Sequence, residues 1–247
     1  MGGQANTNTT KGYSNFAGSI QSRISANTDA GFSIVSYTGN GTTGSTVGHG
    51  LGKIPDMVIV KSRSVSTNWY VWHKGLTQPD YQIYLNLPSA QDTSVLTFLN
   101  DKAPTSTVFE LPGEGYGSNN SSATYVAYCW AEIEGFSKFG TIKGNNSANG
   151  PYINCGFKPS WIMFKNTDAS AYWAIFDSKR DTFNQCNKVI RANEDSDENT
   201  NLYFIDILSN GFKIRDSGGL NGTANTVYVA FAENPTMNLY GAQATAR

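Results

Sequence analysis

The chain has 247 residues, a formal net charge of -1 from 18 Lys and Arg against 19 Asp and Glu, and only 15% charged residues. A chain of this length can bury a core without disulfide or metal support. Its charge balance excludes the basic stripe that neutralises nucleic-acid phosphates, so we predict one large or two small domains and no nucleic-acid partner.

The N-terminal segment MGGQANTNTTKGYSN lacks the basic start and apolar run of a signal peptide. No apolar stretch approaches the roughly 20 residues of a membrane-spanning helix. We therefore expect a soluble protein made in a cytoplasm, with no membrane span. The cysteines Cys129, Cys155 and Cys186 form neither an even set nor a C-x-x-C pair, which predicts buried free thiols.

Short runs of β-branched and aromatic residues recur between turn-forming residues along the chain. They predict strands at residues 31–37, 56–62, 68–74, 81–87, 94–99, 107–111, 124–133, 135–142, 160–166, 172–177, 187–192, 201–208, 211–215 and 226–233. Helical periodicity is almost absent. The pattern predicts an all-β protein built from antiparallel β-sandwich units of jelly-roll type.

The two halves of the chain resemble each other. Gly31-Phe32-Ser33 recurs as Gly135-Phe136-Ser137, an offset of 104 residues (135 - 31), and Lys61 matches Lys165 at the same offset. Self-similarity over most of the chain predicts two tandem repeats of about 104 residues. We place repeat 1 at residues 31–134 and repeat 2, with a C-terminal tail, at residues 135–247. Residues 1–30 are predicted to form an N-terminal arm that orders against a partner.

The stretch YTGNGTTGSTVGHGL contains a G-x-G-x-x-G at Gly39, Gly41 and Gly44, directly after a predicted strand. A dinucleotide site would need a helix next, but further glycines and Pro55 follow, and the second repeat has a different glycine spacing. We interpret the stretch as a variable loop between two strands and predict no cofactor. Its exposed tip is the predicted partner-contact loop, with contact residues Thr42, Thr43, Ser45, Thr46 and His49.

Other arrangements of reactive residues are incomplete. Asp216-Ser217-Gly218-Gly219 is similar to a serine-protease nucleophile segment, but neither His49 nor His73 lies in the sequence context of its general base. Asp195, Asp197, Asn199 and Asp206 imitate a calcium loop without its turn glycine and flanking helices. We predict a turn, two ordinary histidines and a solvated loop at these places, and no metal site.

Glu132 and Glu134 alternate along a predicted strand, which invites a hydrolase with two carboxylates. The second repeat keeps Glu233 but has Pro235 at the other position, so we expect a structural role at a strand end. Trp69 and Trp72 could stack on sugar rings. Because Trp173 and Phe176 are their counterparts, we predict core packing for this set.

The blocks GFSIVSYTGNGTTGSTVGHGLGKIPDMVIVKS, YVAYCWAEIEGFSKFGTIKGN, GPYINCGFKPSWIMFKNTD and YVAFAENP are similar to a domain of unassigned function in virion structural and tail fibre proteins of marine bacteriophages. The resemblance covers about Ala26 to Pro235. It implies a virion component on the particle exterior, assembled in the host cytoplasm, without enzymatic activity and in contact with other virion proteins.

This resemblance leaves several functions open. The first is a tail fibre or adhesin component engaged in host attachment. The alternatives are a capsid decoration protein, favoured by the absence of an obvious shaft after Met1, or a carbohydrate-binding module for host-surface glycans. Virion symmetry predicts a homo-oligomer, with a trimer as the expected state.

Overall fold

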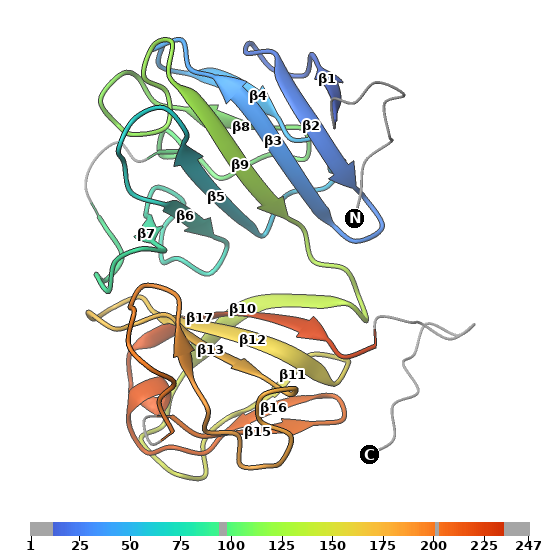
Figure 1. The fold of residues 1–247 in the computed structure, drawn as a ribbon, viewed down its shortest axis with the longest axis vertical. Helices are drawn as coiled ribbons and strands as arrows, with labels where there is room; N and C mark the ends of the chain where they lie inside the picture. Colours follow the sequence, from blue (N-terminus) through green and yellow to red (C-terminus); the bar gives the residue numbers. More distant parts are fainter. Residues whose placement is uncertain (1–11, 94–97, 201–202, 235–247) are drawn as a thin grey trace. The chain divides into compact units, whose positions relative to one another are not determined.

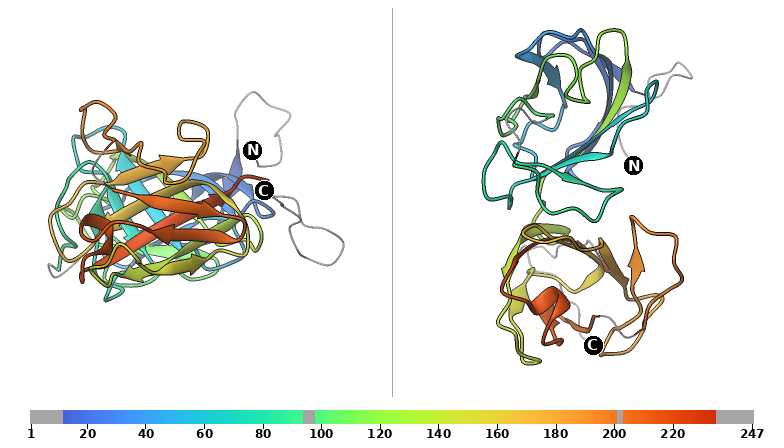
Figure 2. Two further views of the ribbon diagram at one scale, coloured as in Figure 1. Left: turned by 90° about the horizontal axis from the view of Figure 1, so that it is seen from below. Right: turned by 90° about the vertical axis from the view of Figure 1, so that its left-hand side faces the viewer.

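The computed structural model of the protein describes residues 12–93, 98–200 and 203–234. Strands and loops make up this part of the chain, and its single helical element is the short 3-10 turn η1 (Gly219–Asn221), which joins two strands (Figure 2). All ladders between named strands are antiparallel, for example β3 with β9 and β12 with β17. The predicted all-β fold with antiparallel sheets is confirmed. No helix among the described residues is long and apolar enough to cross a membrane.

The chain divides into two compact units. Unit 1 extends to Leu85 and includes Gln91–Glu132, whereas unit 2 contains Asn86–Ala90 and the chain from Ile133 onward. The described residues of unit 1 form nine strands (Figure 1): β1 (Tyr13–Asn15), β2 (Ser22–Asn27), β3 (Phe32–Thr38), β4 (Ser45–Gly48), β5 (Met57–Ser62), β6 (Tyr70–His73), β7 (Ile83–Tyr84), β8 (Val108–Leu111) and β9 (Thr124–Trp130). They form a seven-stranded sheet in the order β1-β2-β3-β9-β5-β6-β7 and a two-stranded sheet, β4-β8.

The core of unit 1 lies between these two sheets. Alternate residues of β3 and β9 point inward, as the period of two in a strand requires. Tyr37 on β3 stacks on Tyr125 of β9, with ring centroids 5.1 Å apart. It also meets Phe109 of β8 edge to face at 6.0 Å. Tyr37, Tyr125 and Phe109 thus form part of the core, while the alternate residues of β3 and β9 point outward.

Unit 2 has the same kind of two-sheet construction. Its strands are β10 (Ser137–Lys143), β11 (Tyr152–Asn154), β12 (Pro159–Asn166), β13 (Ala174–Asp177), β14 (Ile190–Arg191), β15 (Ile205–Leu208), β16 (Gly211–Ile214) and β17 (Asn225–Ala232). The sheets have the orders β10-β17-β12-β13-β14 and β11-β16-β15. Phe212 of β16 packs edge to face on Phe164 and on Tyr228, each at 5.4 Å, and so joins the two sheets in one core.

Five strands have the same order in both units. The run β3-β9-β5-β6-β7 of unit 1 corresponds to β10-β17-β12-β13-β14 of unit 2. Unit 1 adds β2 and β1 beyond β3, and no named strand occupies that position beside β10 in unit 2. Strand order thus agrees with the sequence similarity between the two halves, and the units differ at this edge of the sheet.

The predicted N-terminal arm differs from the structure. Residues 22–27 form β2, whose Arg23 to Asn27 pair with Ser36 to Phe32 of β3, and β1 pairs with β2 in turn. Ile24 is buried in the core, which explains why this polar segment joins the sheet. Residues 1–11 of the predicted arm lie outside the described residues, as do residues 235–247 of the predicted tail.

The predicted boundaries of the repeats also differ from the units. Unit 2 begins at Ile133 and takes in Asn86–Ala90, a segment placed in repeat 1 by sequence. The carbonyl of Pro88 accepts hydrogen bonds from the backbone N–H of Ala171 at 2.8 Å and from Lys165 Nζ at 3.1 Å, which holds this segment to unit 2. The predicted strand at 94–99 falls mostly outside the described residues.

Candidate functional site

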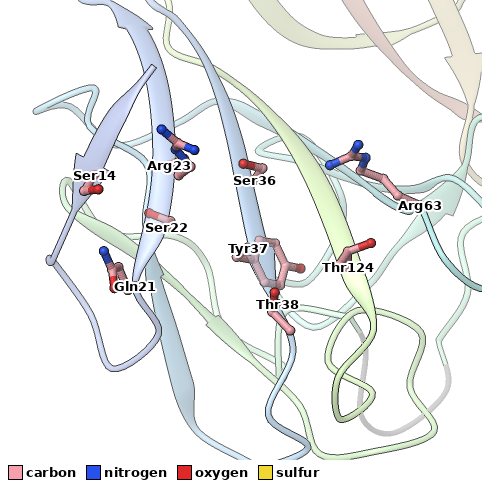
Figure 3. A pocket seen from close by; sticks show the side chains of 9 residues that line it. All are labelled: Ser14, Gln21, Ser22, Arg23, Ser36, Tyr37, Thr38, Arg63 and Thr124. Atoms are coloured by element: carbon pink, nitrogen blue, oxygen red, sulfur yellow. The ribbon is translucent and has the colours of Figure 1, made fainter. Parts of the chain in front are cut away.

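An open trough lies on the outward face of the seven-stranded sheet of unit 1 (Figure 3). Its volume is about 520 Å³. We call it the arginine trough and define it by its lining residues, which are Ser14, Gln21, Ser22, Arg23, Ser36, Tyr37, Thr38, Arg63 and Thr124.

Strand register sets the floor of the arginine trough. Ser36 and Thr38 point outward from β3 because Tyr37 between them points into the core, where its hydroxyl donates to the carbonyl of Ser118 at 2.8 Å. Arg23 on β2 lies opposite Ser36, and Thr124 on β9 lies opposite Thr38. The pairing of three neighbouring strands therefore brings residues far apart in the sequence into one polar surface.

Most side chains of the floor have unused hydrogen-bonding capacity. The side chains of Ser14, Gln21, Ser36, Thr38 and Thr124 make no hydrogen bond to any other residue that the structure describes. The Ser22 hydroxyl, in contrast, is buried and donates to the carbonyl of Gly48 at 2.9 Å. Donors and acceptors that the fold does not use are available to a ligand.

The two arginines of the trough are exposed and lack an acidic partner among the described residues. The described arginines of unit 2, in contrast, each have an acidic partner. Arg180 Nη1 lies 2.6 Å from Glu198 Oε2, Arg215 Nε lies 3.3 Å from Asp206 Oδ2, and Arg191 pairs with Glu194. The described arginines of unit 2 are thus paired with carboxylates, whereas those of the arginine trough are not.

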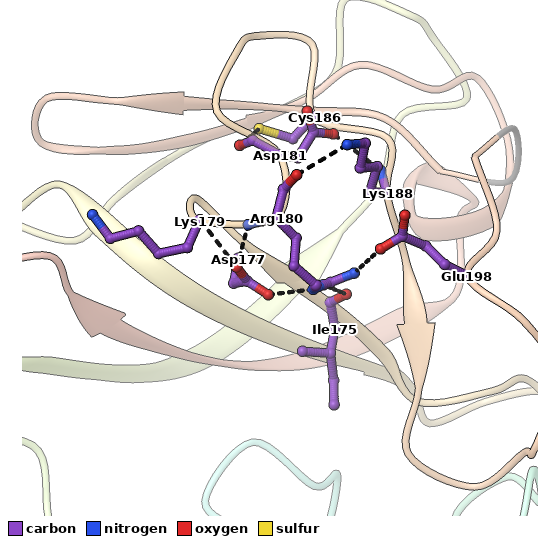
Figure 4. Close-up of polar contacts among 8 residues, drawn as sticks. All are labelled: Ile175, Asp177, Lys179, Arg180, Asp181, Cys186, Lys188 and Glu198. Atoms are coloured by element: carbon purple, nitrogen blue, oxygen red, sulfur yellow. Dashed lines mark hydrogen bonds and ion pairs between the residues drawn. The ribbon is translucent and has the colours of Figure 1, made fainter.

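In the charged loop after β13, Arg180 is an arginine whose guanidinium group is fully engaged in contacts within the fold (Figure 4). The Arg180 side chain pairs with Asp177 and with Glu198, and its Nη2 donates to the carbonyl of Ile175 at 3.2 Å. Lys188 Nζ donates to the carbonyl of Arg180 at 3.0 Å. These contacts order the loop and use the charges that a ligand would need.

The run that imitates a calcium loop is part of this network. Asp195 and Asp197 are exposed. The neighbouring Glu194 and Glu198, and Asp206, each pair with an arginine. Asn199 exchanges backbone hydrogen bonds with Val189 at 2.8 and 2.9 Å. Nowhere in residues 12–93, 98–200 and 203–234 do three or more His, Cys, Asp or Glu side chains gather as a metal site would require. The run is thus tied into unit 2 by ion pairs and backbone contacts.

The predicted partner-contact loop is only partly exposed. Thr42 and Thr43 are exposed and Thr46 is half-buried, whereas Ser45 and His49 are buried. This burial corrects the prediction for Ser45 and His49. Its cause is β4, since Ser45–Gly48 pairs with β8 instead of projecting as a loop tip.

His49 has a structural role. Its Nε2 donates to the carbonyl of Thr105 at 3.1 Å, and its Nδ1 accepts from the backbone N–H of Leu51 at 3.3 Å. Burial lowers its pKa, although the hydrogen bond to Thr105 opposes this shift. A neutral imidazole that uses both nitrogens within the fold is not positioned to contact a partner.

The glycines of the G-x-G-x-x-G sequence form the turn between β3 and β4. The N–H groups of Gly39, Gly41 and Gly44 donate to the carbonyls of Ala123, Asn119 and Leu111 at 2.9, 2.9 and 3.0 Å. These amides are the groups that would bind a phosphate in a dinucleotide fold. Here they hold the loop to the rest of unit 1, in agreement with its interpretation as a connecting loop.

The two candidate carboxylates differ from their predicted setting. Strand β9 ends at Trp130, so Glu132 and Glu134 do not share a strand face as predicted. The carboxylate of Glu132 lies 3.0 Å from Lys74 Nζ, which also lies 2.8 Å from Asp56. Glu134 is exposed. The structural role expected for Glu132 at a strand end agrees with its ion pair.

The remaining residues from the sequence lie in core or turn positions. Trp72 and Trp173 are buried, as is His73, while Trp69 is half-buried. Asp216 lies in the turn before η1, where burial raises its pKa to about 6. Cys129, Cys155 and Cys186 are free and buried, as predicted.

Sequence reasoning missed Arg23 and Arg63. Neither belongs to a motif, and each is a single charge in a polar stretch. The one available signal was strand parity, because both arginines occupy outward positions next to residues that point into the core.

The family model described as "Domain of unknown function (DUF7483)" matches residues 5–235, which include both units and the whole arginine trough. The chain belongs to the DUF7483 family. No curated protein and no solved structure matches it. Membership in the DUF7483 family assigns no activity, so a functional argument depends on the geometry of the chain itself.

Proposed function

We propose that the protein is a non-enzymatic exterior subunit of a bacteriophage particle, such as a tail fibre or adhesin component, that takes part in host attachment. The observation that carries this proposal is the arginine trough, an open polar surface on which most of the lining side chains make no hydrogen bond to another described residue. An exterior recognition surface needs unpaired donors that face outward. The resemblance of the sequence blocks to virion structural proteins gives the proposal its setting.

We also infer that the two units arose by duplication of one β unit. The common strand order supports this, and so do matched hydrogen bonds. Lys61 Nζ donates to the carbonyl of Thr67 at 2.7 Å, and Lys165 Nζ donates to the carbonyl of Ala171 at 3.0 Å, six residues further along in each case. A repeated scaffold with one specialised surface suits a binding subunit.

Localisation on the particle tests the proposal. Gold-labelled antibody against the protein should decorate the exterior of intact particles, and soluble protein should compete with particles for attachment to host cells. Label on the tail supports the attachment role. Label over the whole head supports the alternative of a capsid decoration protein, and particles without label overturn both.

The non-enzymatic part has a separate test. Incubation of the protein with host-surface polysaccharide should leave the chain length of the polysaccharide unchanged. Depolymerisation by the wild type that disappears in Glu132→Gln would contradict the proposal that the protein is not an enzyme.

The expected homo-oligomer is tested by light scattering during gel filtration. The mass of a trimer is the predicted result, and the mass of a stable monomer would contradict it.

A further inference from the structure

We propose that the arginine trough binds an acidic oligosaccharide, with Arg23 and Arg63 each holding one carboxylate or sulfate group of the ligand. This proposal extends the proposed function and rests on it in one respect, namely that the ligand is part of a cell surface. The site itself is argued from the charges, the spacing and the lining of unit 1.

The two arginines of the trough carry unpaired positive charge. Guanidinium groups bind carboxylates and sulfates through two parallel hydrogen bonds, which makes arginine the usual residue for planar recognition of such anions. Arg23 and Arg63 are the two arginines of the described chain that have no carboxylate partner there, and both line the same trough. A ligand with negatively charged groups would supply the acidic partners that the two arginines lack among the described residues.

The two charges are separated by two intervening strands, β3 and β9. Arg23 belongs to β2, Arg63 directly follows β5, and the sheet order β2-β3-β9-β5 puts three interstrand spacings between them. Strand register places Arg63 two residues further along the sheet than Arg23. At about 4.8 Å for each interstrand spacing and about 3.4 Å for each residue, the backbones at the two positions are about 16 Å apart. The Arg63 side chain reaches back over the sheet toward β9 (Figure 3). A single small anion does not span this distance, but an extended chain with repeated negative charges does.

The floor of the trough carries hydroxyl groups. Ser36 lies between the two arginines, and Thr38 and Thr124 add hydroxyl groups to one side of the line that joins them (Figure 3). Hydroxyls both donate and accept, which matches the hydroxyl groups of sugar rings. The ligand class that combines spaced anionic groups with many hydroxyls is an acidic oligosaccharide.

The residues that line the trough do not fit a nucleic-acid ligand. Single-stranded nucleic acids bind through aromatic platforms for the bases together with a positive groove. The aromatic residue of the trough, Tyr37, has its ring in the core, stacked on Tyr125. The net charge of the chain is -1, so there is no broad positive field to attract a polyanion without hydroxyl contacts.

Unit 2 provides an internal comparison. By strand register, Thr167 occupies the position of Arg63, and Asn225 that of Thr124. The carboxylate of Asp168 accepts from the Asn225 side chain at 2.9 Å and adds negative charge at this place. The described residues of unit 2 also form no strand equivalent to β2, so this part of the unit has an arginine at neither position. Binding is therefore assigned to unit 1.

Calorimetric titration of the full chain with oligogalacturonates of increasing length tests the inference, with malto-oligosaccharides as the neutral series. We expect binding that strengthens with the length of the acidic chain until both arginines are engaged and that weakens with salt. Arg23→Ala and Arg63→Ala should each reduce affinity about three- to tenfold, and the double variant should abolish detectable binding. Lys53→Ala removes an exposed charge of unit 1 outside the trough and should bind like the wild type.

Three results would overturn the inference. They are equal affinity for the neutral series, unchanged affinity of the double variant, and equally tight binding of a single-stranded oligonucleotide of the same charge. Both arginines are exposed, and unchanged thermal unfolding will verify that the variants fold. If particles carry the protein and attach through it while the double variant still binds uronates, only this inference fails. If the trough binds uronates but the protein is absent from particles, only the proposed function fails.

Discussion

The side chain of Asn119 accepts a hydrogen bond from the backbone N–H of Asn40 at 3.0 Å. Its amide group donates to the carbonyls of Thr42 at 3.0 Å and Pro112 at 2.7 Å. In unit 2, Asn221 accepts from the N–H of Asn145 at 3.0 Å and donates to the carbonyl of Ser147. A completely buried asparagine thus fixes the same turn in both units, after β3 and after β10.

Asn119→Ala and Asn221→Ala should each destabilise the protein by about 2 to 4 kcal/mol, because several buried backbone groups lose their partner at once. Denaturant unfolding followed by tryptophan fluorescence measures the effect. Asn187→Ala is the control, since its side chain makes no hydrogen bond to a described residue, and should change stability by less than about 0.5 kcal/mol. A loss of that small size in either buried variant would contradict the role given to these asparagines.

Gly144→Ala should destabilise unit 2 by about 2 to 3 kcal/mol, because the new Cβ would lie 2.2 Å from the backbone of Asn221 and Gly222. Calorimetric unfolding gives the comparison. Gly218→Ala is a matched substitution in the same unit with open space at the Cβ position, so it should cost far less. Equal effects of the two substitutions would exclude close packing as the reason for glycine at 144.

Stability at acid pH should depend on Glu233. The hydrogen bond from Lys158 lowers the pKa of this carboxyl below its usual 4.5, although burial opposes the shift. The folded-state pKa is depressed, so the stabilisation is fully present above pH 4.5 and is lost as pH falls through the lower pKa of the folded protein.

Glu233→Gln should therefore cost about 1 kcal/mol at neutral pH. The difference from the wild type should shrink as the pH of the unfolding experiment falls below 4.5. Glu134→Gln removes an exposed carboxylate for comparison and should leave the acid dependence unchanged. A difference that is constant over the whole pH range would argue against the ion pair with Lys158.

The three thiols should resist modification in the folded protein. Cys129, Cys155 and Cys186 are buried, and burial raises the pKa of Cys129, which keeps it in the unreactive thiol form. A colorimetric disulfide reagent should label the native chain slowly and all three cysteines after denaturation. Rapid labelling of the native chain would mean that one of these sites opens in solution.

Local patterning was enough to predict the strands with alternating apolar residues, such as β3 and β9. It failed at β2, where Ile24 and Ser22 are the buried residues of a segment that otherwise reads as polar. The partner of β2 is β3, and that pairing supplies the reason for its strand conformation. The short segment of sequence that forms β2 does not by itself contain this information about pairing, so its strand conformation was not predicted.

The arginine trough was hidden for a related reason. Whether an arginine is unpaired depends on which carboxylates the fold brings near it. Arg180 pairs with Glu198, 18 positions away, whereas no carboxylate of the described residues pairs with Arg63. Asn119 is similar, because the residue that it holds, Asn40, lies 79 positions earlier in the chain. The predicted similarity of the two halves, together with strand register, was the basis for the comparison between Arg63 and Thr167.

Lys165 has consequences for any attempt to exchange the units between proteins. The buried Nζ of Lys165 donates to the carbonyls of Pro88, Asn166 and Ala171 at 3.1, 2.8 and 3.0 Å. The first of these acceptors comes from Asn86–Ala90, which precedes most of the second unit in the chain. A gene fusion cut at Ile133 would give unit 2 a buried ammonium group with one acceptor missing. Recombination that preserves both units must therefore carry the short segment around Pro88 along with unit 2.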